Sequence, residues 1–246
     1  MYMKDYIWFM GALLVCMLLS GYASAKVKST YAKYGKVFNR SRLTGRDAAY
    51  RLLRAGGAQD ISIGRVSGQL TDHYHPAKGV VNLSDSTYNS ATVASVAVAA
   101  HEVGHVMQNK NGYLFYKIRT AIVPAVNFGS RLAMPLVLIG LLIEMSSMAV
   151  RNSDLGFYIA MFGVLLYGLS FLFTLVTLPV ELNASRRARK MLIEERILAE
   201  DEIQGATAVL SAAALTYLAS MLTSLVYFLR FLVRVLTMFG RRNDRK

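Results

Sequence analysis

Four long apolar runs dominate the pattern of hydrophobic and polar positions along the chain. They lie near residues 6–25, 131–150, 155–178 and 206–229. Each run reaches the roughly 20 apolar residues that a helix needs to cross the hydrocarbon core of a bilayer. The pattern therefore predicts a mainly α, multi-span helical membrane protein.

The segment between the first two runs is predicted to form a small soluble α+β region at the membrane surface. Thr44 and Asp47 have the spacing of a capping box, which predicts the start of a helix. The pattern over 61–84, which is broken by turn residues, predicts a hairpin or small sheet. A second helix is predicted over about 91–108, and its apolar part is too short to span a membrane.

These elements divide the chain into five predicted segments. Two of them are the first transmembrane helix, residues 1–25, and the soluble region, residues 26–130. Transmembrane helices two and three follow over 131–178, a surface helix over 179–205, and the last transmembrane helix with a basic tail over 206–246.

The formal net charge of +13 is concentrated beside the apolar runs, above all in segments 26–54 and 186–190. No nucleic-acid motif accompanies it, so we expect a lipid bilayer and not nucleic acid as the partner. Basic segments that flank spans stay on the cytoplasmic side, which predicts a cytoplasmic soluble region and an outer N-terminus. A fourth span would place the basic tail outside, so the side of the C-terminus stays open.

The N-terminal run has a second interpretation. Lys4, the apolar core and the sequence Ala23-Ser24-Ala25 resemble a cleavable signal peptide, which would place the soluble region outside. The lysines that follow from Lys26 oppose translocation and favour an uncleaved span. Whether residues 1–25 are removed stays open.

The strongest chemical pattern is His-Glu-Val-Gly-His at residues 101–105, an H-E-x-x-H motif. On a helix, His101 and His105 lie one turn and roughly 6 Å apart on the same face. Two neutral imidazoles can bind Zn²⁺, and Glu102 can accept a proton from water at the metal. The single cysteine, Cys16, lies in the first run and excludes a cysteine-based zinc site. The motif predicts Zn²⁺ as the cofactor of a peptide hydrolase in a zincin-like region.

A catalytic zinc site usually has a third protein ligand besides water. Among the acids after His105, Glu144 lies within an apolar run and Asp154 lies on the predicted opposite side of the membrane. Glu181 follows the third run on the side of the zinc helix. Position alone leaves two interpretations of Glu181 open: a metal ligand, or an acid stabilised at a helix N-terminus.

Longer motifs in the chain resemble the YugP family of bacterial integral-membrane neutral zinc metallopeptidases. These motifs are Leu-Thr-Asp-His-Tyr at 70–74, Ala-Ala-His-Glu-Val-Gly-His at 99–105 and Leu-Pro-Val-Glu-Leu-Asn-Ala-Ser-Arg-Arg-Ala at 178–188. The resemblance extends over nearly the whole chain and implies a multi-pass protein of the bacterial plasma membrane.

The family looks related to larger membrane gluzincins, such as the CAAX prenyl protease and the HtpX heat-shock peptidase. In those, a glutamate that opens an E-x-x-x-D motif is the third ligand, which implies that His101, His105 and Glu181 bind Zn²⁺. The last motif position is Ser185 here, so the carboxylate that would orient a ligand histidine is missing or supplied elsewhere. The implied activity is endopeptidase cleavage of membrane or membrane-proximal proteins, with Glu102 as general base.

Other residues receive weaker expectations. His73 or Tyr74 is a candidate to stabilise the oxyanion, although a histidine near a turn is more often a surface residue or a partner of a ligand. We expect Gly104 to permit close helix packing beside the metal. The hairpin at 68–84 offers an edge strand along which an extended peptide substrate could lie.

Two other function classes compete with this hypothesis. An intramembrane site-2-type protease would carry its motif inside a spanning helix, and the predicted zinc helix is too short for that. A catalytically silent membrane assembly factor with a metal site would tend to lose the general base, whereas Glu102 is present. The natural substrate, the oligomeric state and any regulatory membrane partner do not follow from the sequence.

Overall fold

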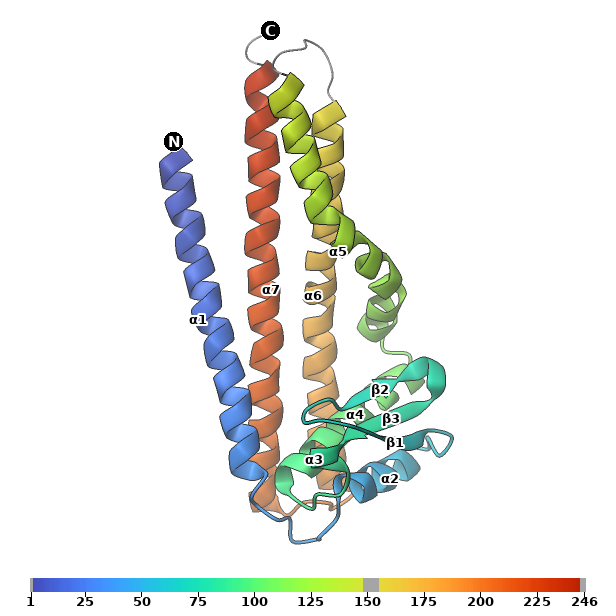
Figure 1. Ribbon diagram of the computed structural model, residues 1–246. Helices are drawn as coiled ribbons and strands as arrows, with labels where there is room; N and C mark the ends of the chain where they lie inside the picture. Colours follow the sequence, from blue (N-terminus) through green and yellow to red (C-terminus); the bar gives the residue numbers. More distant parts are fainter. Residues whose placement is uncertain (1, 148–154, 244–246) are drawn as a thin grey trace. The chain divides into compact units, whose positions relative to one another are not determined.

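The computed structural model describes residues 2–147 and 155–243, which form long helices and one small sheet (Figure 1). The order of elements is α1 (Tyr2–Tyr34), α2 (Gly45–Ala55), β1 (Ser62–Val66), β2 (His73–His75), the 3₁₀ turn η1 (Pro76–Lys78), β3 (Val80–Ser84), α3 (Asp85–Tyr88), α4 (Val93–Lys110), α5 (Leu114–Ser147), α6 (Leu155–Glu194) and α7 (Glu200–Asn243). The predicted mainly α fold with a small α+β region is confirmed.

The chain forms two compact units. The first comprises residues 1–19, 118–177 and 218–246, and the second comprises residues 20–117 and 178–217. Helices α1, α5, α6 and α7 each contribute residues to both units. The second unit contains the sheet and the H-E-x-x-H motif, so the site is built within that unit.

Within residues 2–147 and 155–243, four helices are long and apolar enough to cross a membrane: Tyr6–Tyr34, Leu114–Ile143, Leu155–Glu194 and Glu200–Thr237. Each contains most or all of one predicted apolar run, so the four predicted spans are matched by four helices. Helix α4 is not among the candidates within the described residues.

The helices are longer than the apolar runs from which they were predicted. Helix α1 continues past residue 25 because its next residues include good helix formers, and it ends before Gly35. Helix α5 begins at Leu114, four residues after α4 ends at Lys110. The apolar pattern locates the buried or lipid-facing part of a helix, whereas only a breaking residue or a cap defines its end.

The predicted separate surface helix over 179–205 is not present. Helix α6 runs without a break through Pro179 to Glu194, and α7 then runs from Glu200 to Asn243 with no turn into a separate tail helix. A proline removes one backbone hydrogen bond, and long membrane helices tolerate that loss. Glu181 is therefore an interior residue of a long helix and not an acid at a helix N-terminus. Asp154, which was predicted on the opposite side of the membrane, lies outside the described residues, and so does the side chain of Glu144.

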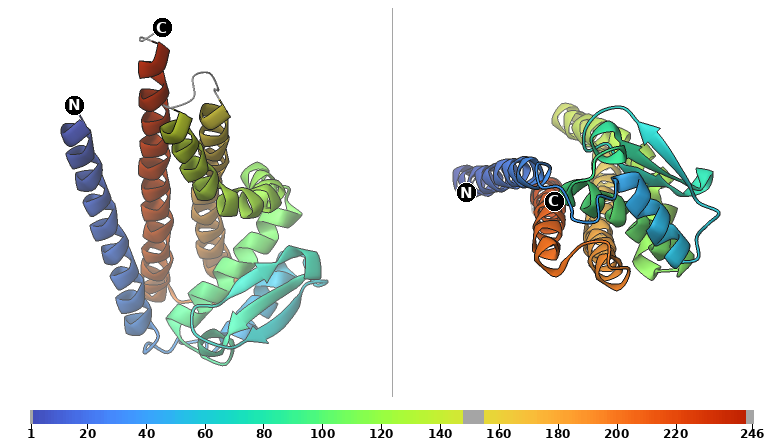
Figure 2. Two further views of the ribbon diagram at one scale, coloured as in Figure 1. Left: turned by 45° about the horizontal axis from the view of Figure 1, so that its top comes forward. Right: turned by 90° about the horizontal axis from the view of Figure 1, so that it is seen from below.

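A three-stranded sheet covers α4 in the second unit (Figure 2). The strand order is β1-β3-β2, with β1 parallel and β2 antiparallel to the central strand β3. The small sheet predicted over 61–84 is thus confirmed, although its strands begin and end at different residues from those implied by the pattern. Val81 and Leu83 of β3 are fully buried against the helices, whereas Asn82 between them points to the other face.

Capping side chains fix the starts of the two helices under the sheet. Thr44 accepts a hydrogen bond from the backbone of Asp47, whose carboxylate bonds back to the Thr44 N–H, so the predicted capping box is confirmed. Thr92 and Ser95 form the same arrangement at the start of α4. Each such cap is worth about 1 kcal/mol.

The first unit has its own packed helices. Val137 of α5, Ala160 and Val164 of α6 and Val235 of α7 form a buried cluster, against which partly buried aliphatic and aromatic side chains pack. This cluster is separate from the core of the sheet-containing unit.

Candidate metal centre

Helix α4 presents the H-E-x-x-H residues from within the core of its unit. Val103 and Val106 pack into that core at 0 % and 2 % exposure, which holds the helix in one rotation. The opposite face therefore carries His101 and His105, whose ring centroids are 4.7 Å apart. The one-turn spacing that the sequence predicts is present in the structure.

Glu181 of α6 lies against both histidines. Its carboxylate oxygen Oε2 is 3.1 Å from Nε2 of His101 and 3.5 Å from Nε2 of His105. The side chain is buried, with only 2 % of its residue surface exposed. Burying a carboxylate is costly unless a cation or several donors face it, so this placement requires a compensating positive charge.

The spacing of the three groups fits a tetrahedral metal ion. One ligand atom from each of His101, His105 and Glu181 can be chosen so that all lie within 4.8 Å of one another. Zn²⁺ binds nitrogen and carboxylate oxygen at about 2.0–2.2 Å, which separates two ligand atoms of a tetrahedron by about 3.3 Å. The measured 3.1 and 3.5 Å match that value. The donor set of two imidazoles and one carboxylate also suits zinc.

His101 and His105 each have a second partner at the nitrogen that faces away from the cluster. Nδ1 of His105 is 3.0 Å from Oε1 of Gln108, and Nδ1 of His101 is 3.1 Å from the hydroxyl oxygen of Ser185. Such outer contacts orient a ligand ring and direct its other nitrogen to the metal. Ser185, which stands four positions after Glu181, therefore contacts His101 itself.

Glu102 is the second buried carboxylate of α4, at 7 % exposure. Burial raises its pKa to about 7, and the nearby charges of Glu181 and Asp72 add to this effect. The His101 ring and the backbone N–H of Tyr74, which hydrogen-bonds to Glu102, lower the pKa of Glu102. A carboxyl group whose pKa lies near neutrality can both accept and release a proton, as a general base must.

The structure does not bring His73 to this cluster. Its Nδ1–H donates to the carbonyl of Thr71 at 2.9 Å, and its Nε2 accepts from Nδ2 of Asn82 at 3.1 Å. Asn82 lies on the sheet face away from α4, and so does His73, its register partner on β2. This placement offers no support for an oxyanion role of His73, which stays an untested prediction.

Tyr74, the other candidate, points toward α4. Its hydroxyl accepts a hydrogen bond from Asn109 at 3.1 Å, and its ring packs on the core. Together with the backbone bond to Glu102, these contacts fasten β2 along the helix that carries the motif.

Two residues at the site escaped the sequence analysis. Gln108 follows His105 by three positions, a spacing that places both on one helix face but that is shared by many glutamines on helix surfaces. Tyr116 of α5 is buried at 6 %, and its ring centroid is 6.3 Å from that of His105. No spacing rule links Tyr116 to the motif, because a turn separates α4 from α5.

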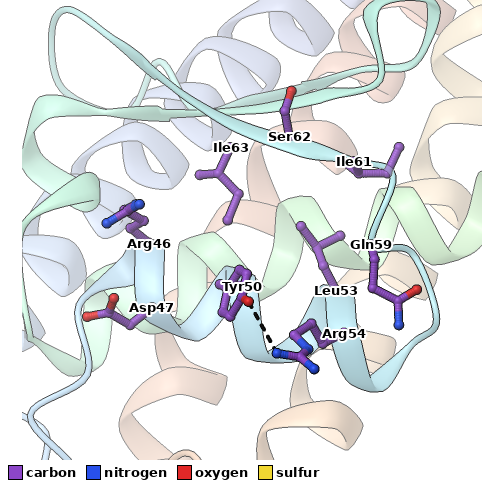
Figure 3. Close-up of a pocket in the computed structure, with 9 residues that line it drawn as sticks. All are labelled: Arg46, Asp47, Tyr50, Leu53, Arg54, Gln59, Ile61, Ser62 and Ile63. Carbon is purple, nitrogen blue, oxygen red and sulfur yellow. Dashed lines mark hydrogen bonds between the residues drawn. The ribbon is translucent and has the colours of Figure 1, made fainter.

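A separate cavity of about 600 Å³ lies between α2 and the start of β1 (Figure 3). Tyr50 and Leu53 line it from the helix, and Ile61 and Ile63 line it from the strand side. None of the described residues that line it belongs to α4 or α6, so this cavity is not part of the histidine–glutamate cluster.

Comparison with known proteins agrees with this geometry. A family model described as "putative neutral zinc metallopeptidase" matches residues 9–236 of the chain. The chain belongs to this family. It is also 40% identical over 215 residues to the "putative membrane protease YugP" of Bacillus subtilis (strain 168), a match that covers 87% of this chain and 91% of the relative. No solved structure matches the chain significantly. The membrane-protease relative and the four long apolar helices together identify a membrane protein.

Close contact between α4 and α6 brings Glu181 within reach of the histidines. A Cβ atom added at Gly104 would lie 2.6 Å from the carbonyl oxygen of Ala184 and 3.2 Å from its Cα. Both neighbours are backbone atoms, which cannot rotate away. The expectation that Gly104 permits close helix packing beside the site is confirmed.

We predict that Gly104→Ala forces the two helices apart. The substitution should lower the free energy of unfolding by about 1–3 kcal/mol, as overpacking does, and should weaken zinc binding. Thermal unfolding and zinc titration of the purified protein measure the two effects. Gly21→Ala is the matched control, because a Cβ at Gly21 meets no atom within 4 Å. If Gly104→Ala behaves like this control in both measurements, the close contact is not required.

Proposed function

We propose that the protein is a zinc-dependent endopeptidase that hydrolyses peptide bonds of membrane or membrane-proximal proteins. The observation that carries this proposal is the convergence of His101, His105 and Glu181 at distances that suit one metal ion. Glu102 stands on the same helix as the two histidines, buried and with a pKa raised to about 7.

His101, His105 and Glu181 would hold Zn²⁺, and a water molecule would complete the site. Bound zinc would polarise the scissile carbonyl and make the attacking water more acidic. Glu102 accepts a proton from that water and later passes it to the nitrogen of the leaving amine. Its pKa suits both steps, because a group that titrates near the working pH gains and loses a proton at similar cost.

The edge strand β2 is the segment best placed to hold a substrate. It lies at one end of the strand order, and its Tyr74 N–H bonds to Glu102, so its outer edge runs beside the proposed general base. An extended peptide that joined this edge would present its backbone to the metal centre. Nothing about this edge selects particular side chains, so we propose a substrate class defined by its position at the membrane and not by sequence.

The two rival functions have less support. An intramembrane site-2-type protease needs its motif within a spanning helix, and α4 is an 18-residue helix packed in the core of the sheet-containing unit. A silent assembly factor has no need for a buried carboxylate with a pKa near neutrality, which Glu102 provides.

We further propose that the site faces the cytoplasm, in the plasma membrane of a bacterium. Lys26, Lys28, Lys33 and Lys36 follow the apolar part of α1, and such clusters are retained on the inner side. The relative with 40% identity is a bacterial protein.

The central test replaces Glu102 by Gln, which removes the proton acceptor and keeps nearly the same shape. We expect zinc content to stay at the wild-type level and peptide hydrolysis to fall by a factor of roughly 10²–10⁴, the range for loss of a general base. Zinc analysis and hydrolysis of an unstructured protein such as casein by the detergent-solubilised enzyme measure both. Glu181→Ala should in contrast lose zinc and activity together. Wild-type turnover by Glu102→Gln would disprove the proposed general base.

The location is tested with a single exposed thiol at Lys36. In a Cys16→Ala background, Lys36→Cys should resist a membrane-impermeant maleimide in intact cells and react once the cells are permeabilised. Because Lys36 is exposed in the turn after α1, its reactivity reports only the side of the membrane. Labelling in intact cells would instead place the site outside.

A further inference from the structure

Gln108 joins the histidine helix to the helix that carries the third ligand. It is completely buried, on α4, one turn beyond His105. Its Oε1 is 3.0 Å from Nδ1 of His105, and its Nε2 is 2.7 Å from the carbonyl oxygen of Val180 and 3.0 Å from Oδ1 of Asn183. One side chain thus contacts a metal-ligating ring and the residue that precedes Glu181.

The partners of Gln108 leave one orientation for its amide. The Val180 carbonyl can only accept a hydrogen bond, so the NH₂ group of Gln108 must face α6. Asn183 is fixed in the same way, because Nε of Arg187, which can only donate, lies 2.8 Å from its Oδ1. The oxygen of Gln108 therefore faces His105.

This orientation determines where the proton of His105 lies. A glutamine oxygen can only accept, so Nδ1 of His105 must carry the hydrogen. In the neutral ring, Nε2 then holds a lone pair that points toward Oε2 of Glu181, 3.5 Å away. Two acceptors that face each other at this distance repel unless a cation lies between them, which is the situation at a metal site.

We infer that Gln108 is a positioning residue that fixes His105 in the metal-binding tautomer and fixes the place of Glu181 relative to it. This inference rests on the proposed zinc site and names residues beyond the three ligands. His101 lacks an equivalent constraint, because the hydroxyl of its partner Ser185 can donate or accept. The two histidines therefore differ: the protein prepares His105 for the metal before binding and leaves the proton of His101 free to move between its nitrogens.

Zinc affinity measured against a competing chelator tests this role. Gln108→Leu removes all three hydrogen bonds at similar volume, and we expect zinc binding to weaken roughly 10- to 100-fold. Gln59→Leu is the matched control: it makes the same substitution at an exposed glutamine outside the histidine–glutamate cluster, so its zinc affinity should equal that of the wild type. Equal affinities for Gln108→Leu and the wild type would overturn the inference.

A second measurement needs no substitution. The chain has four histidines, so ¹⁵N-histidine labelling gives few ring signals. In the metal-free wild type, at an alkaline pH where the ring is neutral, the Nδ1–H of His105 should be hydrogen-bonded and should exchange slowly with water. Rapid exchange, or a proton on Nε2, would overturn the inference even if Gln108→Leu did not fold.

Neither measurement uses a peptide substrate. A wild type that binds zinc but cleaves no peptide would contradict the proposed function while both results on Gln108 still stand. A normal protease with an unconstrained His105 would contradict only the role of Gln108.

Discussion

The burial of Glu181 against two imidazoles is the interaction on which the site depends. A carboxylate that is 2 % exposed is stable only if positive charge or hydrogen-bond donors face it, and the rings of His101 and His105 lie 3.1 and 3.5 Å from Glu181 Oε2. The two histidines supply positive charge when they are protonated, and a divalent ion would supply more. A bound metal should therefore stabilise the folded unit as well as enable chemistry.

This interaction requires α4 and α6 to lie unusually close. Gly104 permits backbone contact with Ala184, and Gln108 binds Val180 directly. His101 and Glu181 are 80 residues apart in the chain, so the cluster is complete only when α6 lies against α4. The metal centre is thus a product of the long apolar helices as well as of the small soluble region.

Local patterns in the sequence were enough to predict the elements and two of the three ligands. The capping box at Thr44 and the one-turn spacing of His101 and His105 each depend on residues a few positions apart. Glu181 needed more: its position relative to the predicted spans left two interpretations open, and the family resemblance favoured one. In the structure, Oε2 of Glu181 lies 3.1 Å from Nε2 of His101 and 3.5 Å from Nε2 of His105.

Other features were beyond local patterns. Helix α6 continues through Pro179, and this continuity depends on helix packing. In the sequence alone, Pro179 indicates only a break in the helix. The register of the sheet determines the hydrogen bond between the Tyr74 N–H and Glu102, and it also determines the outward orientation of His73. The alternation of polar and apolar residues does not define this register over such short strands. Gln108 lacked a clear signal because glutamine is common on helix surfaces, and only its complete burial shows its importance.

X-ray absorption at the zinc edge, on the purified protein loaded with one zinc ion, tests the central claim most directly. The account predicts two imidazole nitrogens and oxygen ligands at about 2.0–2.2 Å, with no sulfur. A spectrum with three or more imidazoles would bring His73 or His75 into the site, and a spectrum with one or none would remove His101 or His105. Either result would contradict a centre made by His101, His105 and Glu181.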